Sequence, residues 1–232
     1  PEAPLLEAAG WELIVQKEGE GIRYMAYRRP YRRGLYQYLC TTLYDNVEAD
    51  SWLQFYNDDL RKPSWDDNIL HVDLLPREGP GVWSLPPAEG QQLDYVYTVV
   101  KFPRPFASRE YCYARRIWTV PDLSSSAPGG RAHYGVMAVA HHPGLDAVRP
   151  RSGGRAVFVD DYMSGFRIRT RPGAGGGVAT EMTTLYFEDS TVKATLLNIA
   201  VKKGLWGYVP LLEQEYNKFI SDQGISVCTG TG

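Results

Sequence analysis

Residues 101–116 read KFPRPFASREYCYARR, and the second half of this segment gives the clearest indication of the fold. The prolines end at position 105, and from position 109 onward aromatic and other strand-forming residues predict a β-strand over residues 109–119. Because side chains alternate between the two faces of a strand, Tyr111, Tyr113 and Arg115 share one face. An arginine on a buried face has to be paired or solvated. The strand is therefore predicted to place the positively charged Arg115 on the same face as two tyrosines.

Further strand-like runs lie on both sides of this segment, each rich in aromatic and β-branched residues. Short segments containing Gly, Pro, Ser or Asp separate them, and such segments favour hairpin loops over domain linkers. We therefore expect an α+β fold whose main layer is a curved antiparallel sheet of about nine strands. The predicted strands are residues 11–17, 21–28, 34–44, 68–75, 91–101, 109–119, 131–141, 155–169 and 178–187.

A change of hydrophobic period predicts a short helix over residues 46–60, NVEADSWLQFYNDDL. Apolar residues at helical spacing form one stripe, with Asp45 or Asn46 as the expected N-cap. The stripe consists of Trp52, Phe55, Tyr56 and Leu60.

The period becomes helical again from Asp189 or Ser190 onward, which predicts a long C-terminal helix. Gly204, Gly207 and Pro210 interrupt its pattern, so we expect a kink or break near residues 205–207. An amphipathic helix on the concave face of a curved sheet leaves either a filled core or a ligand cavity.

Length and composition narrow the classes of function. The 232 residues suit one domain, and the net charge of −2 lacks the basic excess of a nucleic-acid-binding protein. No run approaches the roughly 18 apolar residues of a membrane span, and the N-terminus lacks the pattern of a signal peptide. Cys40, Cys112 and Cys228 are far apart, which favours neither a zinc site nor a disulfide framework. We therefore expect a cytoplasmic protein that contacts membranes only peripherally.

The sequence shows none of the usual motifs of an enzyme. The four histidines have no metal-binding spacing, and no serine stands in a Gly-x-Ser-x-Gly motif. We expect no catalysis, no metal and no cofactor. An enzyme remains a distant alternative.

Several local motifs resemble those of START (StAR-related lipid transfer) domains. Residues 60–66, LRKPSWD, are similar to a basic-x-x-Trp-Asp pattern that follows the first core helix in that family. Residues 101–116 resemble its Pro-x-x-x-Arg-Asp-Tyr/Phe-Val-Tyr-x-Arg signature, with Glu110 and Cys112 as departures. WEL at residues 11–13 and GLYQY at 34–38 also look similar, so the resemblance extends from about residue 10 to 220.

The resemblance implies a helix-grip fold with an internal lipid tunnel, closed by the C-terminal helix as a lid. It predicts a START domain over residues 11–220, a tail or remnant of a first helix at 1–10, and a C-terminal tail at 221–232. The chain is also consistent with a piece cut from a longer one. The implied activity is lipid binding and transfer between membranes by a monomer that contacts the membrane transiently, with no nucleic acid as partner.

In phosphatidylcholine-binding members of the family, a tyrosine of the first core helix and the basic residue of the Trp-Asp motif hold the phosphate. By position these are Tyr56 and Lys62, with Asp66 as the acidic residue of the motif. Lysine replaces arginine here, and it offers no planar two-pronged donor to phosphate. Arg61 is an alternative donor.

The choline cage of those members corresponds to Tyr111, Tyr162 and Thr98, where threonine replaces an aromatic residue. Ser164 follows Tyr162 on the same predicted face. A quaternary ammonium is held by the faces of several rings, so this cage lacks one wall. The expected ligand is a phospholipid such as phosphatidylcholine, while ethanolamine lipids, other phospholipids and apolar ligands stay open.

A sterol, a terpenoid or another apolar ligand, sensed through a protein partner, is the alternative function. Sterol-binding relatives place an arginine and an acidic residue inside the tunnel, and Arg115 fits the arginine while Tyr113 lies beside it. The acidic position corresponds to His71, with Asp73 two residues later.

Two surface hypotheses complete the sequence analysis. Leu205, Trp206 and Tyr208 are predicted to contact the membrane interface, where tryptophan and tyrosine are favoured. Arg167, Arg169 and Arg171 alternate on one strand face, and we expect them to be solvated or to meet anionic headgroups.

Overall fold

Strand β6, Arg109–Pro121, lies between β5 and β7 in a large antiparallel sheet. In this computed structural model the described residues are 3–32, 34–77, 91–102, 104–123, 130–149, 156–173, 176–192 and 194–224, without the side chains of residues 3 and 194–206. Tyr111, Tyr113 and Arg115 are buried on one face of β6, as the alternation predicted. Cys112 and Ala114 are buried on the other face, so β6 is covered on both sides.

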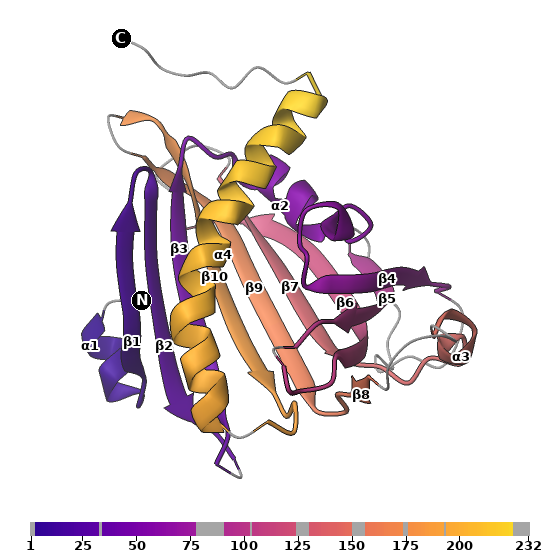
Figure 1. Ribbon diagram of the computed structural model, residues 1–232. Helices are drawn as coiled ribbons and strands as arrows, with labels where there is room; N and C mark the ends of the chain where they lie inside the picture. Colours follow the sequence, from indigo (N-terminus) through magenta and orange to yellow (C-terminus); the bar gives the residue numbers. More distant parts are fainter. Residues whose placement is uncertain are drawn as a thin grey trace.

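The sheet has the strand order β1-β2-β3-β10-β9-β7-β6-β5-β4, and β8 pairs with β6 in parallel. Figure 1 shows it as a curved layer crossed by one long helix. The strands are β1 (Glu12–Gly19), β2 (Ile22–Pro30), β3 (Tyr36–Asp45), β4 (Ile69–Leu75), β5 (Gln92–Val100), β6, β7 (Arg131–Val139), β8 (Val157–Phe158), β9 (Tyr162–Pro172) and β10 (Val178–Glu188). The predicted antiparallel sheet is thus confirmed, except that the run at 155–169 divides into β8 and β9.

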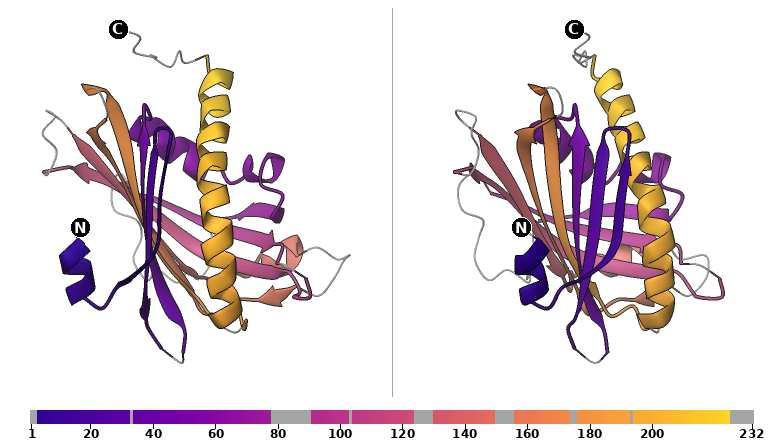
Figure 2. Two further views of the ribbon diagram at one scale, coloured as in Figure 1. Left: turned by 60° about the vertical axis from the view of Figure 1, so that its left-hand side comes forward. Right: turned by 90° about the vertical axis from the view of Figure 1, so that its left-hand side faces the viewer.

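The helices lie on both faces of the sheet. Helices α2 and α4 lie on the concave face, whereas α1 lies on the opposite, convex face (Figure 2). There Leu6 of α1 packs with Trp11 and Tyr27. The helices are α1 (Ala3–Ala8), α2 (Ala49–Asn57), the 3-10 turn η1 (Lys62–Ser64), α3 (Leu145–Val148) and α4 (Ala194–Asp222).

Helix α2 begins later than predicted. Asn46 adopts a left-handed φ of 60°, and its backbone N–H donates to the Val178 carbonyl of β10. The chain is therefore still tied to the sheet at Asp45 and Asn46, and the N-cap is Glu48. The helix also ends before Leu60, which is exposed.

Helix α4 runs without a break from Ala194 to Asp222, with Pro210 inside it. Of the kink or break predicted near residues 205–207, the break is wrong because the helix is continuous there. A proline removes one backbone hydrogen bond but leaves the other turns of the helix intact. The apolar side of the following turns packs on the main core and holds the helix in place. Its buried members are Val209, Leu212, Tyr216, Phe219 and Ile220.

Candidate functional site

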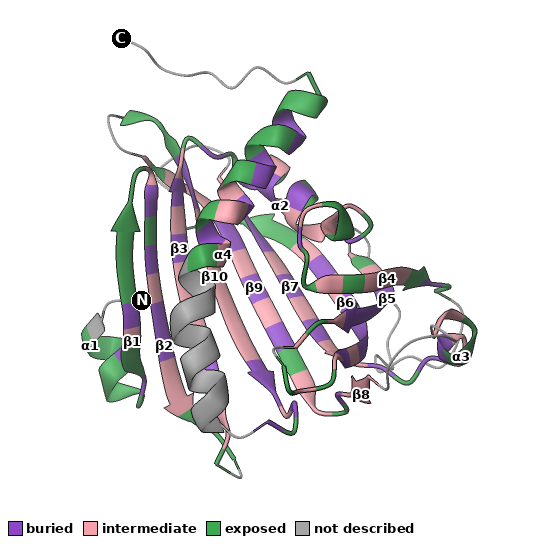
Figure 3. Cartoon of the chain, in the orientation of Figure 1, coloured by how far each residue is buried: buried purple, intermediate pink, exposed green. Residues whose placement is uncertain are grey.

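Polar and aromatic side chains gather on the concave face beside α2. Tyr111, Tyr113 and Arg115 of β6 share this face with Tyr162 and Ser164 of β9. Tyr162 and Tyr186 keep part of their surface accessible although they lie on this inner face. Figure 3 shows such intermediate burial along the middle strands beneath α4. The site therefore combines ring faces with hydroxyl groups on the side of the sheet that α4 covers.

Tyr162 is the centre of a tyrosine cluster. Its ring centroid lies 5.5 Å from that of Tyr111, 5.8 Å from Tyr113 and 5.9 Å from Tyr186. Tyr111 and Tyr162 meet edge to face, so their rings touch each other. A cation enclosed between the two ring faces would require the rings to move apart. Sequence analysis placed Tyr111 and Tyr162 together but missed Tyr186.

Glu188 of β10 provides a buried carboxylate beside these rings. Its Oε2 accepts a hydrogen bond from the Tyr111 hydroxyl at 2.7 Å. Burial, together with the nearby charge of Glu188, raises the pKa values of Tyr111 and Tyr186 well above the usual value. These phenols therefore stay protonated and act as hydrogen-bond donors. Sequence analysis missed Glu188 because it stands at the end of a strand, outside any motif.

Thr98 lies on β5 directly opposite Tyr111. Its hydroxyl donates to the His71 carbonyl at 3.0 Å. Thr98 is therefore next to the tyrosine cluster, but its hydroxyl is already hydrogen-bonded to the backbone of β4. No ring stands at this position.

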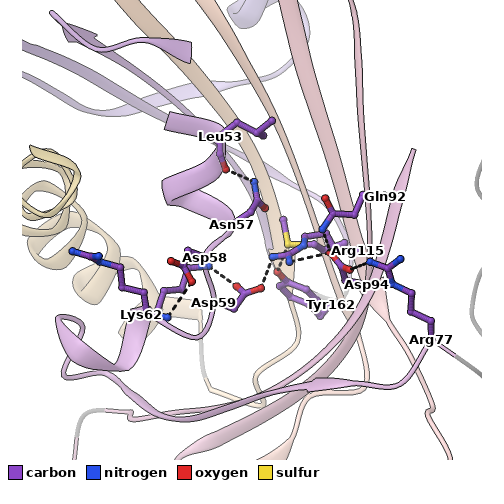
Figure 4. Close-up of polar contacts among 12 residues, drawn as sticks. Leu53, Asn57, Asp58, Asp59, Lys62, Arg77, Gln92, Asp94, Arg115 and Tyr162 are labelled. Atoms are coloured by element: carbon purple, nitrogen blue, oxygen red, sulfur yellow. Dashed lines mark hydrogen bonds and ion pairs between the residues drawn. The ribbon is translucent and has the colours of Figure 1, made fainter. Parts of the chain in front are cut away.

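Arg115 is held by two carboxylates from different parts of the chain. Its Nη1 lies 2.6 Å from Asp59 Oδ2, and its Nη2 lies 3.3 Å from Asp94 Oδ2. Figure 4 shows the guanidinium between these two side chains, close to Tyr162. All three charged residues are buried. A buried charge is tolerated when it is paired in this way.

His71, which stands at the acidic position of the sterol-binding relatives, is not the partner of Arg115. His71 pairs with Asp73 through a 2.7 Å contact. In the β4–β5 ladder it stands opposite Val99, whereas Val72, the next residue, stands opposite Thr98. Since Thr98 shares the inner face with Tyr111, His71 lies on the other face of the sheet. The carboxylates beside Arg115 come from Asp59, just after α2, and from Asp94, opposite Arg115 on β5.

Lys62 and Tyr56 belong to the same site. Lys62 Nζ lies 2.7 Å from Asp59 Oδ1 and 5.4 Å from the centre of the Tyr56 ring. Burial, and secondly Asp59, raise the pKa of Tyr56 to about 12. The structure thus brings Tyr56, Lys62 and Arg115 together. Arg61 instead contacts Asp222 of α4, with Nη2 and Oδ2 2.6 Å apart.

Asp66 is buried and serves the local backbone. Its Oδ1 accepts hydrogen bonds from the backbone N and the side-chain Nδ2 of Asn68, at 2.9 and 3.0 Å. It also hydrogen-bonds Tyr208 of α4, whose ring centroid lies 6.1 Å from that of Trp65. Tyr208 thus contacts the segment after α2. The side chains of Leu205 and Trp206 lie outside the described residues.

The arginines of β9 lie on the convex face. Arg167, Arg169 and Arg171 all contact Glu181 of β10, at distances of 2.7 to 3.1 Å. Beside them is an open depression with a volume of about 530 Å³, whose walls include the stacked rings of Trp118 and Tyr134. This arginine group is separated from the tyrosine cluster by the thickness of the sheet.

In the described part of the chain, no three His, Cys, Asp or Glu side chains are grouped so as to hold a metal ion. Nor does any helix of this part have the length and apolar character to cross a membrane.

Two known proteins are similar to this chain in sequence, while no protein-family model matches it. Bovine phosphatidylcholine transfer protein is 24% identical over 151 residues, which span 61% of this chain and 63% of the bovine protein, just under two thirds. Human phosphatidylcholine transfer protein is 23% identical over 206 residues, which span 88% of this chain and 82% of the human one.

Solved structures share the overall fold of this chain. Human STARD10 matches with a TM-score of 0.66 and 14% identity, over 97% of this chain and 83% of its own. A STAR-related lipid transfer protein from Xanthomonas axonopodis matches at 0.55, with 17% identity over 90% of this chain and 99% of its own. The lipid transfer domain of human StarD13 matches at 0.52, with 15% identity over 90% of each chain. A curved antiparallel sheet that holds a long C-terminal helix on its concave face, with these neighbours, gives the chain the helix-grip fold of START domains.

Proposed function

We propose that this chain binds one lipid molecule between the concave face of the sheet and α4, and carries it between membranes. The observation that carries the proposal is a pair of cations, Arg115 with Lys62, beside an inner face on which aromatic and apolar side chains form the main core. Such a face solvates acyl chains and offers a charged anchor to a headgroup. The relatives named as phosphatidylcholine transfer proteins favour a phospholipid as the ligand.

The headgroup is proposed to bind beside α2. Tyr56, Lys62 and Arg115 supply donors for a phosphate, and Tyr111 and Tyr162 supply ring faces for an ammonium group. Each ring contributes about 0.5–2 kcal/mol to such a contact. Tyr113, Thr98 and Ser164 line the adjacent inner face, and Asp66 holds the segment that carries Lys62.

A second candidate is a neutral lipid with a hydroxyl group, such as a sterol or terpenoid alcohol, sensed through a protein partner. One observation favours it. Arg115 is already paired with Asp59 and Asp94, and its buried Nε has no hydrogen-bond partner among the described residues. A hydroxyl oxygen could accept from this nitrogen without adding a charge.

Lipid exchange is proposed to occur at a membrane surface in the cytoplasm, without a chemical step. A lipid leaving into water would expose its acyl chains at a cost of about 0.8 kcal/mol per CH₂ group. Contact with a bilayer removes this cost. Leu205, Trp206 and Tyr208 are the residues proposed to touch the bilayer during a transient encounter of the monomer.

Native mass spectrometry of the purified chain, followed by lipid extraction, tests the ligand. The expected result is one lipid per chain, with occupancy or lipid class changed in Tyr111→Ala and Lys62→Ala. Tyr134→Ala, which removes a tyrosine from the convex face, is the control and should leave the lipid unchanged. If Tyr111→Ala and Lys62→Ala both keep the wild-type lipid, the headgroup assignment is wrong.

Vesicle assays separate the carrier from the sensor. Fast movement of lipid from donor to acceptor vesicles supports the carrier. Tight retention of a hydroxyl lipid, with binding of a partner only in its presence, supports the sensor.

A further inference from the structure

Two cations and two anions form a neutral cluster at the candidate headgroup site. Asp59 contacts Lys62 through Oδ1 and Arg115 through Oδ2, and Arg115 also contacts Asp94 (Figure 4). Asp59 and Arg115 each expose only 3% of their surface. Arg77 contacts Asp94 from outside, but its side chain is 69% exposed. The buried charges therefore already compensate one another before any ligand arrives.

A lipid phosphate at this place would bring one more negative charge into a poorly solvated cluster. Buried charge without a partner is strongly unfavourable. A phosphate would bind to Arg115 and Lys62, and Asp59 is the nearest anion to both of them. We propose that Asp59 is an internal counter-ion that a lipid phosphate has to displace, so that Asp59 determines how strongly the site prefers phospholipids over uncharged lipids. This inference rests on the proposed lipid-binding function.

The Asp59 carboxylate can move away from the two cations, whereas the Asp94 carboxylate is held in place. Asp94 stands in β5 opposite Arg115, and Gln92 Nε2 and Arg77 also contact its carboxylate. Asp59 lies in the turn between α2 and η1, two residues after the last residue of α2. Among the described residues its backbone bonds stay within the same turn, from its N–H to the Asn57 carbonyl and from the Lys62 N–H to its carbonyl. A rotation of the Asp59 side chain therefore takes its carboxylate away from both cations while the sheet stays intact.

The same turn is joined to α4. Arg61 pairs with Asp222 near the end of α4, and its guanidinium lies 5.5 Å from the centre of the Phe219 ring. Asp66, a few residues later, hydrogen-bonds Tyr208. Displacement of Asp59 would thus loosen the segment at 58–66 that holds the second half of α4. A phosphate would weaken the contacts of α4, whereas an uncharged lipid would leave them in place.

Asp59→Asn tests the counter-ion, with Asp58→Asn as the matched control. Asp58 lies in the same turn, and among the described residues its carboxylate accepts one hydrogen bond, from the Arg61 backbone N at 3.3 Å. The probes are dioleoyl phosphatidylcholine and dioleoylglycerol, which have the same acyl chains, and native mass spectrometry measures their competition for the full chain. Asp59→Asn should raise the preference for the phospholipid at least about tenfold, because the cluster then carries one uncompensated positive charge. Asp58→Asn should stay within about twofold of the wild type.

Hydrogen exchange on the wild-type chain tests the displacement without any variant. Amides at 58–66 and 208–222 should exchange faster in the phosphatidylcholine complex than in the dioleoylglycerol complex. Equal exchange in the two complexes, or an unchanged preference in a folded Asp59→Asn variant, overturns the role of Asp59 while lipid binding stands. If the wild type binds neither lipid, the proposed function fails and this inference fails with it.

Discussion

Tyr111 of β6 donates a 2.7 Å hydrogen bond to Glu188 of β10, although β7 and β9 lie between these two strands in the sheet. The contact is possible because β7 ends at Val139, opposite Tyr113, so no residue of β7 stands beside Tyr111. The curved edge left there is closed by Tyr162, which contacts Tyr111 and pairs with Glu188 in the sheet. One hydrogen bond thus joins the two halves of the sheet at the candidate site.

Removal of the Tyr111 hydroxyl should destabilise the fold. In Tyr111→Phe the buried Glu188 carboxylate loses a donor, and such a loss costs about 1–3 kcal/mol. Denaturant unfolding measures the change in the free energy of unfolding. Tyr27→Phe is the control, because the buried Tyr27 hydroxyl makes a long hydrogen bond to a weak acceptor, Met25 Sδ, at 3.5 Å. An equal effect of the two substitutions would contradict a special role of the Tyr111–Glu188 bond.

Two glycines should respond to alanine in opposite directions. A Cβ on Gly135 would lie 2.2 Å from Phe166 Cε1, whereas a Cβ on Gly207 of α4 would meet no atom within 4 Å. Gly135→Ala forces the Phe166 ring out of its place on the inner face, and overpacking of this kind costs about 1–3 kcal/mol. Gly207→Ala should raise the free energy of unfolding by about 0.5–1 kcal/mol, because glycine is unfavourable within a helix. Thermal unfolding of both variants against the wild type checks the signs.

The sheet could be predicted from the sequence because its strands are bounded by loop residues and carry strand-forming side chains. The alternation of side chains along residues 109–119 correctly predicted that Tyr111, Tyr113 and Arg115 lie on one face. The continuity of α4 was not predictable in this way. Gly207 and Pro210 weaken the helix locally, but the packing of the following turns on the sheet outweighs that local preference. Tertiary contacts of this kind leave no local signal.

The charged partners of the site were harder to predict than its rings. Asp94 is separated from Val96 and Thr98 by even numbers of positions, so the alternation of residues 91–101 predicts that it lies on the inner face with them. Its position opposite Arg115, however, depends on how β5 is aligned with β6, which the sequence does not show. Asp59 lies in a turn with no periodicity, and only the path of the chain after α2 brings it to Arg115. Glu188 reaches Tyr111 because β7 ends early. Long-range register and strand length therefore set the electrostatics of the site.

Pro210 offers a test of the continuous helix. Pro210→Ala restores the backbone N–H that can donate to the Trp206 carbonyl, and proline costs about 3 kcal/mol relative to alanine within a regular helix. The variant should be more stable by about 1–3 kcal/mol in denaturant unfolding. Gln214→Ala, an exposed change one turn later, should alter stability by less than about 0.5 kcal/mol. A loss of stability in Pro210→Ala would contradict a regular helix through this position.

His133 predicts a pH dependence of stability. Burial lowers its pKa, and this effect outweighs the attraction of Asp50. The histidine of an unfolded chain titrates near pH 6.5. Below about this pH, His133 is therefore protonated in the unfolded chain while it is still neutral in the folded chain. The free energy of unfolding should therefore fall as the pH decreases from about 7 toward 5. His133→Gln, which removes the titrating group, should flatten this slope, whereas the same change at the exposed His141 should leave it unchanged. Chemical unfolding at several pH values measures the slope, and a slope that survives in His133→Gln would assign the pH dependence to another group.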